Sequence, residues 1–188
     1  MINATVLDTP VGPLALLEHD GALVGGGFTA DPRELHARLH PTLRAHPLVE
    51  VADLGDIAKA HLAYFDGDPT ALEAVAVHQP GTPRRERLLA ALRRVRPGET
   101  VTYAELAVRA GLERTAARAA GQACAQNLVA PAVPCHRVLP AAGGAGLARY
   151  GGYYYGAERK RWLLEHESGR RPAPLVGVSA GRAGASTA

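Results

Sequence analysis

The sequence predicts an α+β protein, in which a small N-terminal α+β domain precedes a C-terminal helical domain. Three observations lead to this prediction. Short β-prone runs broken by turn residues are confined to the first half, helical patterns fill the second, and the two halves carry opposite charges. The Pro- and Gly-rich run 79–83 is typical of a linker. We therefore expect domains at residues 1–79 and 80–168, and a flexible tail at 169–188 that is rich in Gly, Ala and Ser.

The N-terminal half has the punctuation of a small sheet with two helices. Strands are expected at residues 4–7, 14–17 and 22–28, with an Asp20-Gly21 hairpin turn between the last two. A helix is expected near 32–40, with Asp31 as its N-cap and Pro32 in its first turn, and a second helix at 53–64. The run 75–77 is expected to be a last strand.

The C-terminal half has the pattern of successive helices. Residues 84–96 place four apolar side chains on one face, and Pro97-Gly98 ends that helix. A capping box from Thr102 to Glu105 opens the next helix, which Gly111 closes. A third helix at 115–126 is built almost wholly of small residues. This is the layout of a helix-turn-helix; an ordinary alanine-rich packing helix is the alternative.

The charge is strongly divided along the chain. Residues 1–83 contain 4 Lys and Arg against 11 Asp and Glu, a net charge of −7, whereas residues 84–188 contain 17 against 7, a net charge of +10. A basic half favours a polyanionic partner, nucleic acid first, although an Arg-rich solvated surface gives the same count.

Several classes of protein are excluded by the composition. No apolar run reaches the length of a membrane span, and the first residues lack the pattern of a secretory signal. Two cysteines do not make a disulfide framework. Cys124, Cys135 and His136 are too few ligands for a typical metal site, and their spacing does not suit one. We therefore expect a cytoplasmic protein with reduced thiols, no membrane contact and no bound metal.

The segment from Asn127 to Val138 carries the clearest chemistry. A cysteine is a nucleophile only as its thiolate, so Cys135 needs a base or a positive field, and His136 and Arg137 are adjacent. Neighbouring residues of an extended strand face opposite ways, so a Cys135–His136 pair requires a bend or a bridging water. A histidine base also needs an orienting carboxylate, for which Glu167 and Glu165 are the candidates. The alternative is an inert buried cysteine, which describes Cys124 well.

The string Pro134-Cys135-His136-Arg137-Val138 resembles the active-site motif of the O6-alkylguanine-DNA alkyltransferases, also called methylated-DNA–protein-cysteine methyltransferases. The surroundings agree in order and spacing over about residues 4–168, at Gly98–Tyr103, Ala116–Gly121, Asn127 and Lys160–Glu167. The resemblance implies a ribonuclease-H-like N-terminal domain, and a helical C-terminal domain with a helix-turn-helix and an active-site loop. It also implies a DNA repair protein of the cytoplasm, associated with the nucleoid when bound to DNA.

The implied reaction is an irreversible, stoichiometric transfer without a cofactor. A monomer binds the minor groove of double-stranded DNA, rotates an O6-alkylguanine out of the stack, and takes the alkyl group, chiefly methyl, onto Cys135. His136 is the base through a water, Glu167 orients His136, Asn127 stabilises the turn, and Tyr103 donates a hydrogen bond to the guanine. The implied DNA contacts are Arg118, which fills the space left by the base, Thr115, Ala116, Ala117, Ala119, Gln122 and Arg137. The implied pocket consists of Tyr103, Cys135, Val138, Tyr153, Tyr154 and Tyr155.

The chain departs from the family pattern in four places. Leu128 stands where the family usually has proline, Arg84-Arg85 stands where it usually has an aromatic residue and a glutamine, and the loop 139–150 is longer. The run 153–155 places three tyrosines where small residues are common. We expect Tyr154 and Tyr155 to narrow the pocket in favour of methyl groups; stacking on DNA and packing on the loop are the alternatives.

Two other functions compete with alkyl transfer. One is a damage sensor that binds alkylguanine without reacting, against which Cys135 argues. The other is a cysteine hydrolase that uses Cys135, His136 and Glu167, against which the helix-turn-helix pattern argues.

Overall fold

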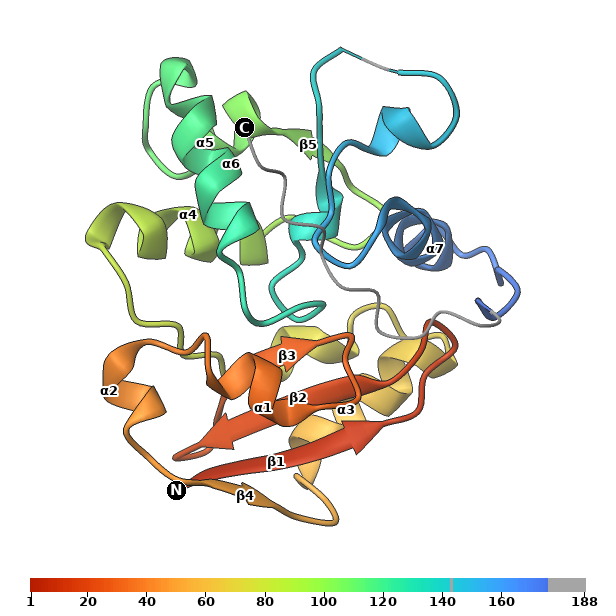
Figure 1. Ribbon diagram of the computed structural model, residues 1–188. Helices are drawn as coiled ribbons and strands as arrows, with labels where there is room; N and C mark the ends of the chain where they lie inside the picture. The colour runs from red at the N-terminus through yellow and green to blue at the C-terminus, as the bar shows by residue number, and fades with distance from the viewer. Residues whose placement is uncertain (143, 176–188) are drawn as a thin grey trace, which may run out of the picture.

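The computed structural model describes residues 1–142 and 144–175 as a mixed α+β protein. Figure 1 shows a small sheet with α3 at one end of the molecule, the green helices α4, α5 and α6 at the other, and the blue α7 beside them. The sequence-based fold class is confirmed at this level. No helix of the described residues is both long and apolar enough to cross a membrane.

The sheet has four strands in the order β3-β2-β1-β4. Adjacent pairs of β1, β2 and β3 are antiparallel and β4 runs parallel to β1; the strands are β1 Ile2–Leu7, β2 Leu14–His19, β3 Ala22–Gly27 and β4 Leu48–Glu50. The three expected N-terminal strands are present, and Asp20 and Gly21 form their hairpin turn at positive φ. The expected strand at 75–77 is reduced to a single bridge between Val77 and Leu23.

The helix expected near 32–40 is present but shorter, as α1 Pro32–His36. A second short helix that was not expected, α2 Pro41–Arg44, follows it, and the two stay separate because Pro41 disfavours helical geometry at the preceding His40, which has φ −53° and ψ 142°. The next helix, α3 Asp56–Asp66, begins later than expected, after Gly55, and ends at the left-handed Gly67.

The C-terminal half contains the helices α4 Pro83–Arg93, α5 Tyr103–Arg109, α6 Ala117–Ala125 and α7 Ala157–Glu167. The capping box between Thr102 and Glu105 is present at the start of α5, as expected. Residues 114–116 form a 3₁₀ turn, so α6 begins two residues later than expected. Two short strands, β5 Val101–Thr102 and β6 Val138–Leu139, pair in parallel, and β6 begins at the last residue of the motif segment.

The main hydrophobic core crosses the expected boundary at residues 79 and 80. It joins Leu16 and Leu23 of the sheet to Leu92 of α4 and Leu163 of α7. A backbone bridge reinforces this contact, because the Gly26 N–H donates to the Leu128 carbonyl at 2.7 Å and the Gly26 carbonyl accepts from the Ala130 N–H. The two halves are therefore packed as one unit around the motif segment.

The beginning of the expected flexible tail is anchored to the folded protein. The Leu175 N–H donates to the Pro10 carbonyl at 2.8 Å, and Trp162 Nε1 donates to the Ala173 carbonyl at 2.9 Å. Residues 170–175 are thus not a free tail, since these contacts return the chain to the first β-turn. Residues 176–188 lie outside the described residues.

A buried histidine in α3 predicts a pH-dependent stability. Burial lowers the pKa of His61 from 6.5 to about 4, although its hydrogen bond to the Ile57 carbonyl acts to raise it. Between these two pH values the unfolded chain takes up a proton that the folded chain excludes, so this contribution to stability is lost as the pH falls. We expect wild type to lose about 3 kcal/mol more than His61→Leu between pH 6.5 and 4.

Urea denaturation of both proteins across this range measures the difference. Other titrating groups cancel because both chains contain them. Parallel pH profiles for wild type and His61→Leu would show that His61 titrates normally in the folded protein.

Candidate active site

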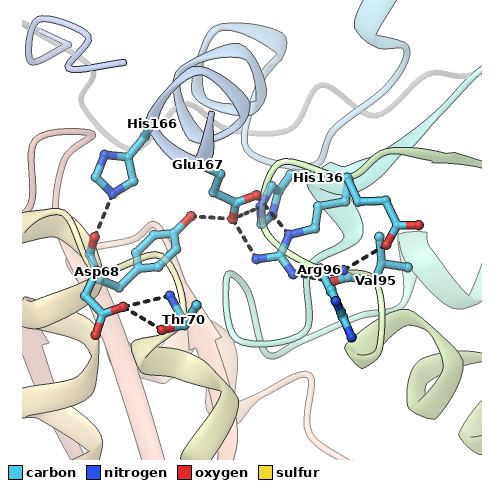
Figure 2. Close-up of polar contacts among 10 residues, drawn as sticks. Asp68, Thr70, Val95, Arg96, His136, His166 and Glu167 are labelled. Atoms are coloured by element: carbon cyan, nitrogen blue, oxygen red, sulfur yellow. Dashed lines mark hydrogen bonds and ion pairs between the residues drawn. The ribbon is translucent and has the colours of Figure 1, made fainter. Parts of the chain in front are cut away.

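The Glu167 carboxylate, at the end of α7, is the centre of the site. Its Oε1 accepts hydrogen bonds from His136 Nε2 at 2.7 Å, Arg137 Nη2 at 2.8 Å and the Tyr64 hydroxyl at 2.8 Å. Its Oε2 accepts from Arg137 Nε at 2.9 Å. Figure 2 shows Glu167 and His166 at the end of the helix, with His136 beside the carboxylate. Of the two carboxylates considered from the sequence, Glu167 is therefore the one bonded to His136.

The environment of Glu167 keeps it ionised. Burial acts to raise its pKa, but the attraction and hydrogen bonds of His136 and Arg137 outweigh burial and hold the pKa well below its usual range. Burial and the nearby carboxylate raise the pKa of Tyr64, so its hydroxyl stays protonated and donates. Tyr64 comes from α3 and was missed from the sequence, because nothing local to it indicates contact with α7.

Arg137 was expected to contact DNA, and the structure contradicts this. Its side chain is only 7% exposed, and its guanidinium is used by Glu167 and by the Val95 carbonyl, which accepts from Nη1. A guanidinium with its donors committed inside the protein is not available to a phosphate. Arg137 instead compensates the charge of the buried carboxylate.

His136 is neutral in the resting protein, as a proton acceptor must be. Burial lowers its pKa below the usual value, although Glu167 acts to raise it. A neutral imidazole that donates from Nε2 to Glu167 carries its lone pair on Nδ1. Among the described residues, that buried Nδ1 has no hydrogen-bond partner. His136 therefore presents an unused acceptor, held in orientation by Glu167.

Cys135 lies in a bend of the kind expected from the sequence. Residues 135–137 form one turn of 3₁₀ helix, and the Cys135 N–H donates to the Val133 carbonyl. Asn127 Nδ2 donates to the Cys135 sulfur at 3.2 Å and to the Val133 carbonyl at 2.8 Å. The side chain of Asn127 thus ties the nucleophile to the loop that precedes it.

The Cys135 thiol is not ionised by its surroundings at rest. Burial raises its pKa above the usual value, while the Asn127 hydrogen bond and the charge of Lys160 act to lower it. In the resting protein the positive field that Cys135 was expected to need is therefore not enough to ionise it, because burial outweighs the two stabilising groups. Proton removal must accompany the reaction.

Lys160 is a buried cation that the sequence analysis did not single out as a site residue. Its Nζ donates to the Val138 carbonyl at 2.7 Å and to the Gly152 carbonyl at 3.4 Å. Burial lowers its pKa, and the nearby Cys135 and Cys124 act to raise it. It lies with Arg159 and Trp162 on the buried face of α7, where the sequence gives no signal for a buried cation.

A cavity of about 300 Å³ opens beside Cys135. Burial and the two nearby thiols raise the pKa of Tyr103, so its hydroxyl is a donor. Val138, expected in the pocket, is fully buried and is not among the residues that line the cavity. The cavity is lined by Tyr103, Gly121, Cys124, Ala125, Asn127, Cys135, Gly152, Tyr153, Tyr154 and Tyr155.

The three tyrosines have different surroundings. Tyr155 packs edge-on against Phe28 at 5.3 Å, and a Cβ on Gly27 would overlap its hydroxyl. Tyr154 is 51% exposed, with Arg38 over its ring at 4.3 Å. Among the described residues, the buried hydroxyls of Tyr153 and Tyr155 have no hydrogen-bond partner. The tyrosine run therefore forms one wall of the cavity and continues to its rim.

The α6 helix lies beside this cavity. Thr115, Arg118 and Gln122 are exposed or half-buried, as are the expected small contacts Ala116, Ala117 and Ala119. Gly121 faces Tyr103, since a Cβ there would lie 3.9 Å from the Tyr103 ring. Within residues 1–142 and 144–175, no group of three or more His, Cys, Asp or Glu side chains is arranged to hold a metal ion.

Comparison with known proteins identifies the family. Residues 83–169 match the family described as "6-O-methylguanine DNA methyltransferase, DNA binding domain". The chain is 37% identical over 176 residues to a Mycobacterium tuberculosis protein named methylated-DNA–protein-cysteine methyltransferase, covering 94% of this chain and 98% of that protein. A human protein of the same name is 35% identical, covering 98% and 89%.

Solved structures agree over the same length. The crystal structure of Mycobacterium tuberculosis OGT in complex with DNA superposes with a TM-score of 0.71 at 31% identity, covering 92% of this chain and 96% of that chain. The crystal structure of the Mycobacterium tuberculosis O6-methylguanine methyltransferase gives a TM-score of 0.69 at 32% identity, with the same coverage. On this identity, coverage and shared fold, the chain belongs to the methylated-DNA–protein-cysteine methyltransferase family.

Proposed function

We propose that this protein repairs DNA by transferring an alkyl group, chiefly methyl, from O6 of guanine to its own Cys135. The observation that carries the proposal is that Cys135 and Tyr103 line the same cavity. The adjacent His136–Glu167 pair and the names of the relatives support it. Each molecule reacts once, because the thioether that forms is not reversed.

The transfer begins with removal of the thiol proton. A water between the Cys135 sulfur and His136 Nδ1 carries the proton to the histidine, whose basicity is supported by the ionised Glu167. The thiolate then attacks the alkyl carbon. A sulfur–carbon bond forms, the carbon–O6 bond breaks, and its electron pair passes to the guanine.

The leaving guanine is stabilised by protein donors. The Tyr103 hydroxyl, kept protonated by its buried setting, donates to the base as negative charge develops on it. The guanine ends neutral with a proton at N1, and His136 gives up the proton that it received. The net reaction has therefore moved one proton from the Cys135 sulfur to guanine N1. The backbone carbonyl of Val138 is already used by Lys160 Nζ, which fixes the loop edge beside the base.

Binding to DNA is assigned to α5 and α6. We infer that they form a helix-turn-helix in the 80–168 domain, that α6 enters the minor groove, and that Arg118 occupies the place of the flipped base. The small alanines of α6 and the accessible Arg118 support this assignment. Residues 1–79 would then be the ribonuclease-H-like domain, and one copy of the chain would bind one lesion.

We assign to the tyrosine run, residues 153–155, the role of selecting the alkyl group by its size. Tyr155 is held against Phe28 and Gly27, so it does not move aside easily when a bulky group enters. Tyr154 at the rim, stacked with Arg38, is placed to contact the DNA backbone or the base. We therefore favour methyl over benzyl as the group transferred.

Intact-protein mass spectrometry tests the transfer. After incubation with a duplex containing one O6-methylguanine, we expect a gain of one methyl group per protein and no more. Both cysteines lie between Arg118 and Arg137, so trypsin leaves them in one peptide, and fragmentation of that peptide assigns the methyl to Cys135 or Cys124.

Cys135→Ser is the matched control, since it keeps a hydrogen-bonding side chain of similar size. We expect it to bind the duplex without gaining mass. Lesion-selective binding by wild type with no mass gain would instead identify a damage sensor, and a hydrolase would show neither.

Substitutions of Arg118 and Arg137 are expected to have different effects, the first on DNA binding and the second on stability. Arg118→Ala should weaken DNA binding and slow transfer while changing the free energy of unfolding by less than about 0.5 kcal/mol, because the side chain is not buried. Arg137→Met should cost about 3 kcal/mol of stability, because it leaves a buried carboxylate undercompensated, but keep the salt dependence of DNA binding. Urea denaturation measures the stability, and fluorescence anisotropy at several salt concentrations measures DNA binding. A weaker salt dependence of DNA binding in Arg137→Met than in wild type would show that Arg137 contacts a phosphate.

Transfer rates from O6-methylguanine and O6-benzylguanine test the narrow cavity. We expect wild type to favour methyl, and Tyr155→Gly to raise the benzyl rate by about tenfold or more. Tyr154→Gly serves as the comparison at the rim and should change the ratio less. Equal rates on both substrates in wild type would remove the argument for a narrow pocket.

A further inference from the structure

Gln79, in the segment between the two halves, is bonded through every polar atom of its side chain. Its Oε1 accepts from the Leu128 N–H at 3.0 Å and from Arg85 Nη2 at 3.2 Å. Its Nε2 donates to Asn127 Oδ1 at 2.9 Å. Two donors on one side and an acceptor on the other leave the carboxamide a single favourable orientation.

Gln79 is the side chain that helps to orient the Asn127 amide. Asn127 Oδ1 accepts from Gln79 Nε2 at 2.9 Å and from the Val129 N–H at 3.1 Å, and its Nδ2 donates to the Val133 carbonyl and the Cys135 sulfur. A half-turn of the Asn127 amide would set its NH₂ against two donors and its oxygen against the sulfur and the Val133 carbonyl. The polarity of Gln79 therefore acts together with the backbone of Val129 and Val133 to direct the Asn127 N–H to the sulfur.

Arg85 holds the first member of this chain in place. Its guanidinium also donates to the Gln79, Pro80 and Gln126 backbone carbonyls, at 3.4, 3.3 and 2.9 Å. These bonds connect the 79–80 segment to the C-terminal end of α6. Arg85 and the Leu128 N–H thus supply the two donors that fix Gln79.

We propose that Gln79 is a positioning residue for the reaction: held by Arg85 and Leu128, it orients Asn127 so that the Asn127 N–H donates to the Cys135 sulfur. The proposal rests on the transfer function only in its final consequence, the rate of repair. Its immediate consequence is a Cys135 thiolate that is more stable than it would be beside a differently oriented Asn127.

Gln79→Glu tests the polarity directly. The variant keeps the length of the side chain and both acceptor contacts, to Leu128 and Arg85, but it removes the donor and places an acceptor against Asn127 Oδ1. We expect the introduced carboxylate to repel Asn127 Oδ1, so that the Asn127 amide turns or withdraws at the expense of its bonds to Val129 and Val133. The sulfur then loses its N–H donor, which raises the pKa of Cys135. At pH 7 the reaction of Cys135 should slow about tenfold and recover as the pH is raised.

The readout is the pH profile of Cys135 alkylation by iodoacetamide, followed by mass spectrometry with the adduct located on Cys135. Gln79→Met keeps the length but carries no polar group, so it should raise the pKa of Cys135 less than Gln79→Glu. Thr82→Asp adds a negative charge nearby while keeping an N-cap for α4, and should leave that pKa unchanged. Urea denaturation of each variant reports whether it is folded.

A pKa of Cys135 in Gln79→Glu equal to wild type, or no higher than in Gln79→Met, would overturn the proposal and reduce Gln79 to a packing residue. If Gln79→Glu does not fold, Gln79→Met carries the test: a raised pKa supports the proposal and an unchanged one overturns it. The same variants are then compared on the O6-methylguanine duplex. Wild type that fails to take up the methyl group, with the iodoacetamide profiles still ordered as expected, would refute the transfer function and leave the positioning role intact.

Discussion

The buried negative charge of Glu167 is the constraint around which this structure is built. A carboxylate away from water is costly unless donors surround it, and here the donors come from α3 and from the 135–137 turn, while α7 supplies the carboxylate. Satisfying that charge therefore requires the sheet half, the cysteine turn and the last helix to be docked together. The geometry of the nucleophile follows from the same requirement, since His136 is next to Cys135 in the turn.

The two halves of the chain share the work at the site. Tyr64 reaches Glu167 from α3, Gln79 reaches Asn127 from the connecting segment, and β3 bridges to the backbone at Val129. Cys135, His136, Asn127 and Glu167 lie in the basic C-terminal half, but Glu167 and Asn127 accept hydrogen bonds from residues before position 80. The family match to residues 83–169 thus covers these four residues without the contacts from Tyr64 and Gln79.

Local signals accounted for what could be predicted from the sequence. The Thr102–Glu105 capping box, the Asp20-Gly21 hairpin and the helical stretches are set by neighbours a few residues away, and they were predicted nearly in place. Cys135 and His136 were singled out by their chemistry, with Glu167 or Glu165 as the carboxylate, and the resemblance selected Glu167; the structure brings His136 and Glu167 into contact.

What escaped prediction depends on contacts between distant segments. The three-residue β4 has no pattern of its own and forms only because β1 is beside it. Arg137 was expected at the DNA only through the resemblance, whereas its burial against Glu167 exists only in the folded chain. Tyr64, Gln79 and Lys160 reach partners that are 103, 48 and 22 residues away respectively, distances over which sequence periodicity carries no information.

The contact between Gly27 and Tyr155 also restricts the order in which these two positions can be substituted. With Tyr155 in place, the methyl group of an alanine at position 27 would overlap the tyrosine hydroxyl. A residue far away in the sequence therefore restricts position 27 to glycine. If Tyr155 is shortened first, a side chain at position 27 meets only the end of the Leu35 side chain, at 2.9 Å, whereas the reverse order passes through a clash with the tyrosine. A library that varied position 27 alone would therefore recover only glycine and would underestimate what this wall of the cavity can accept.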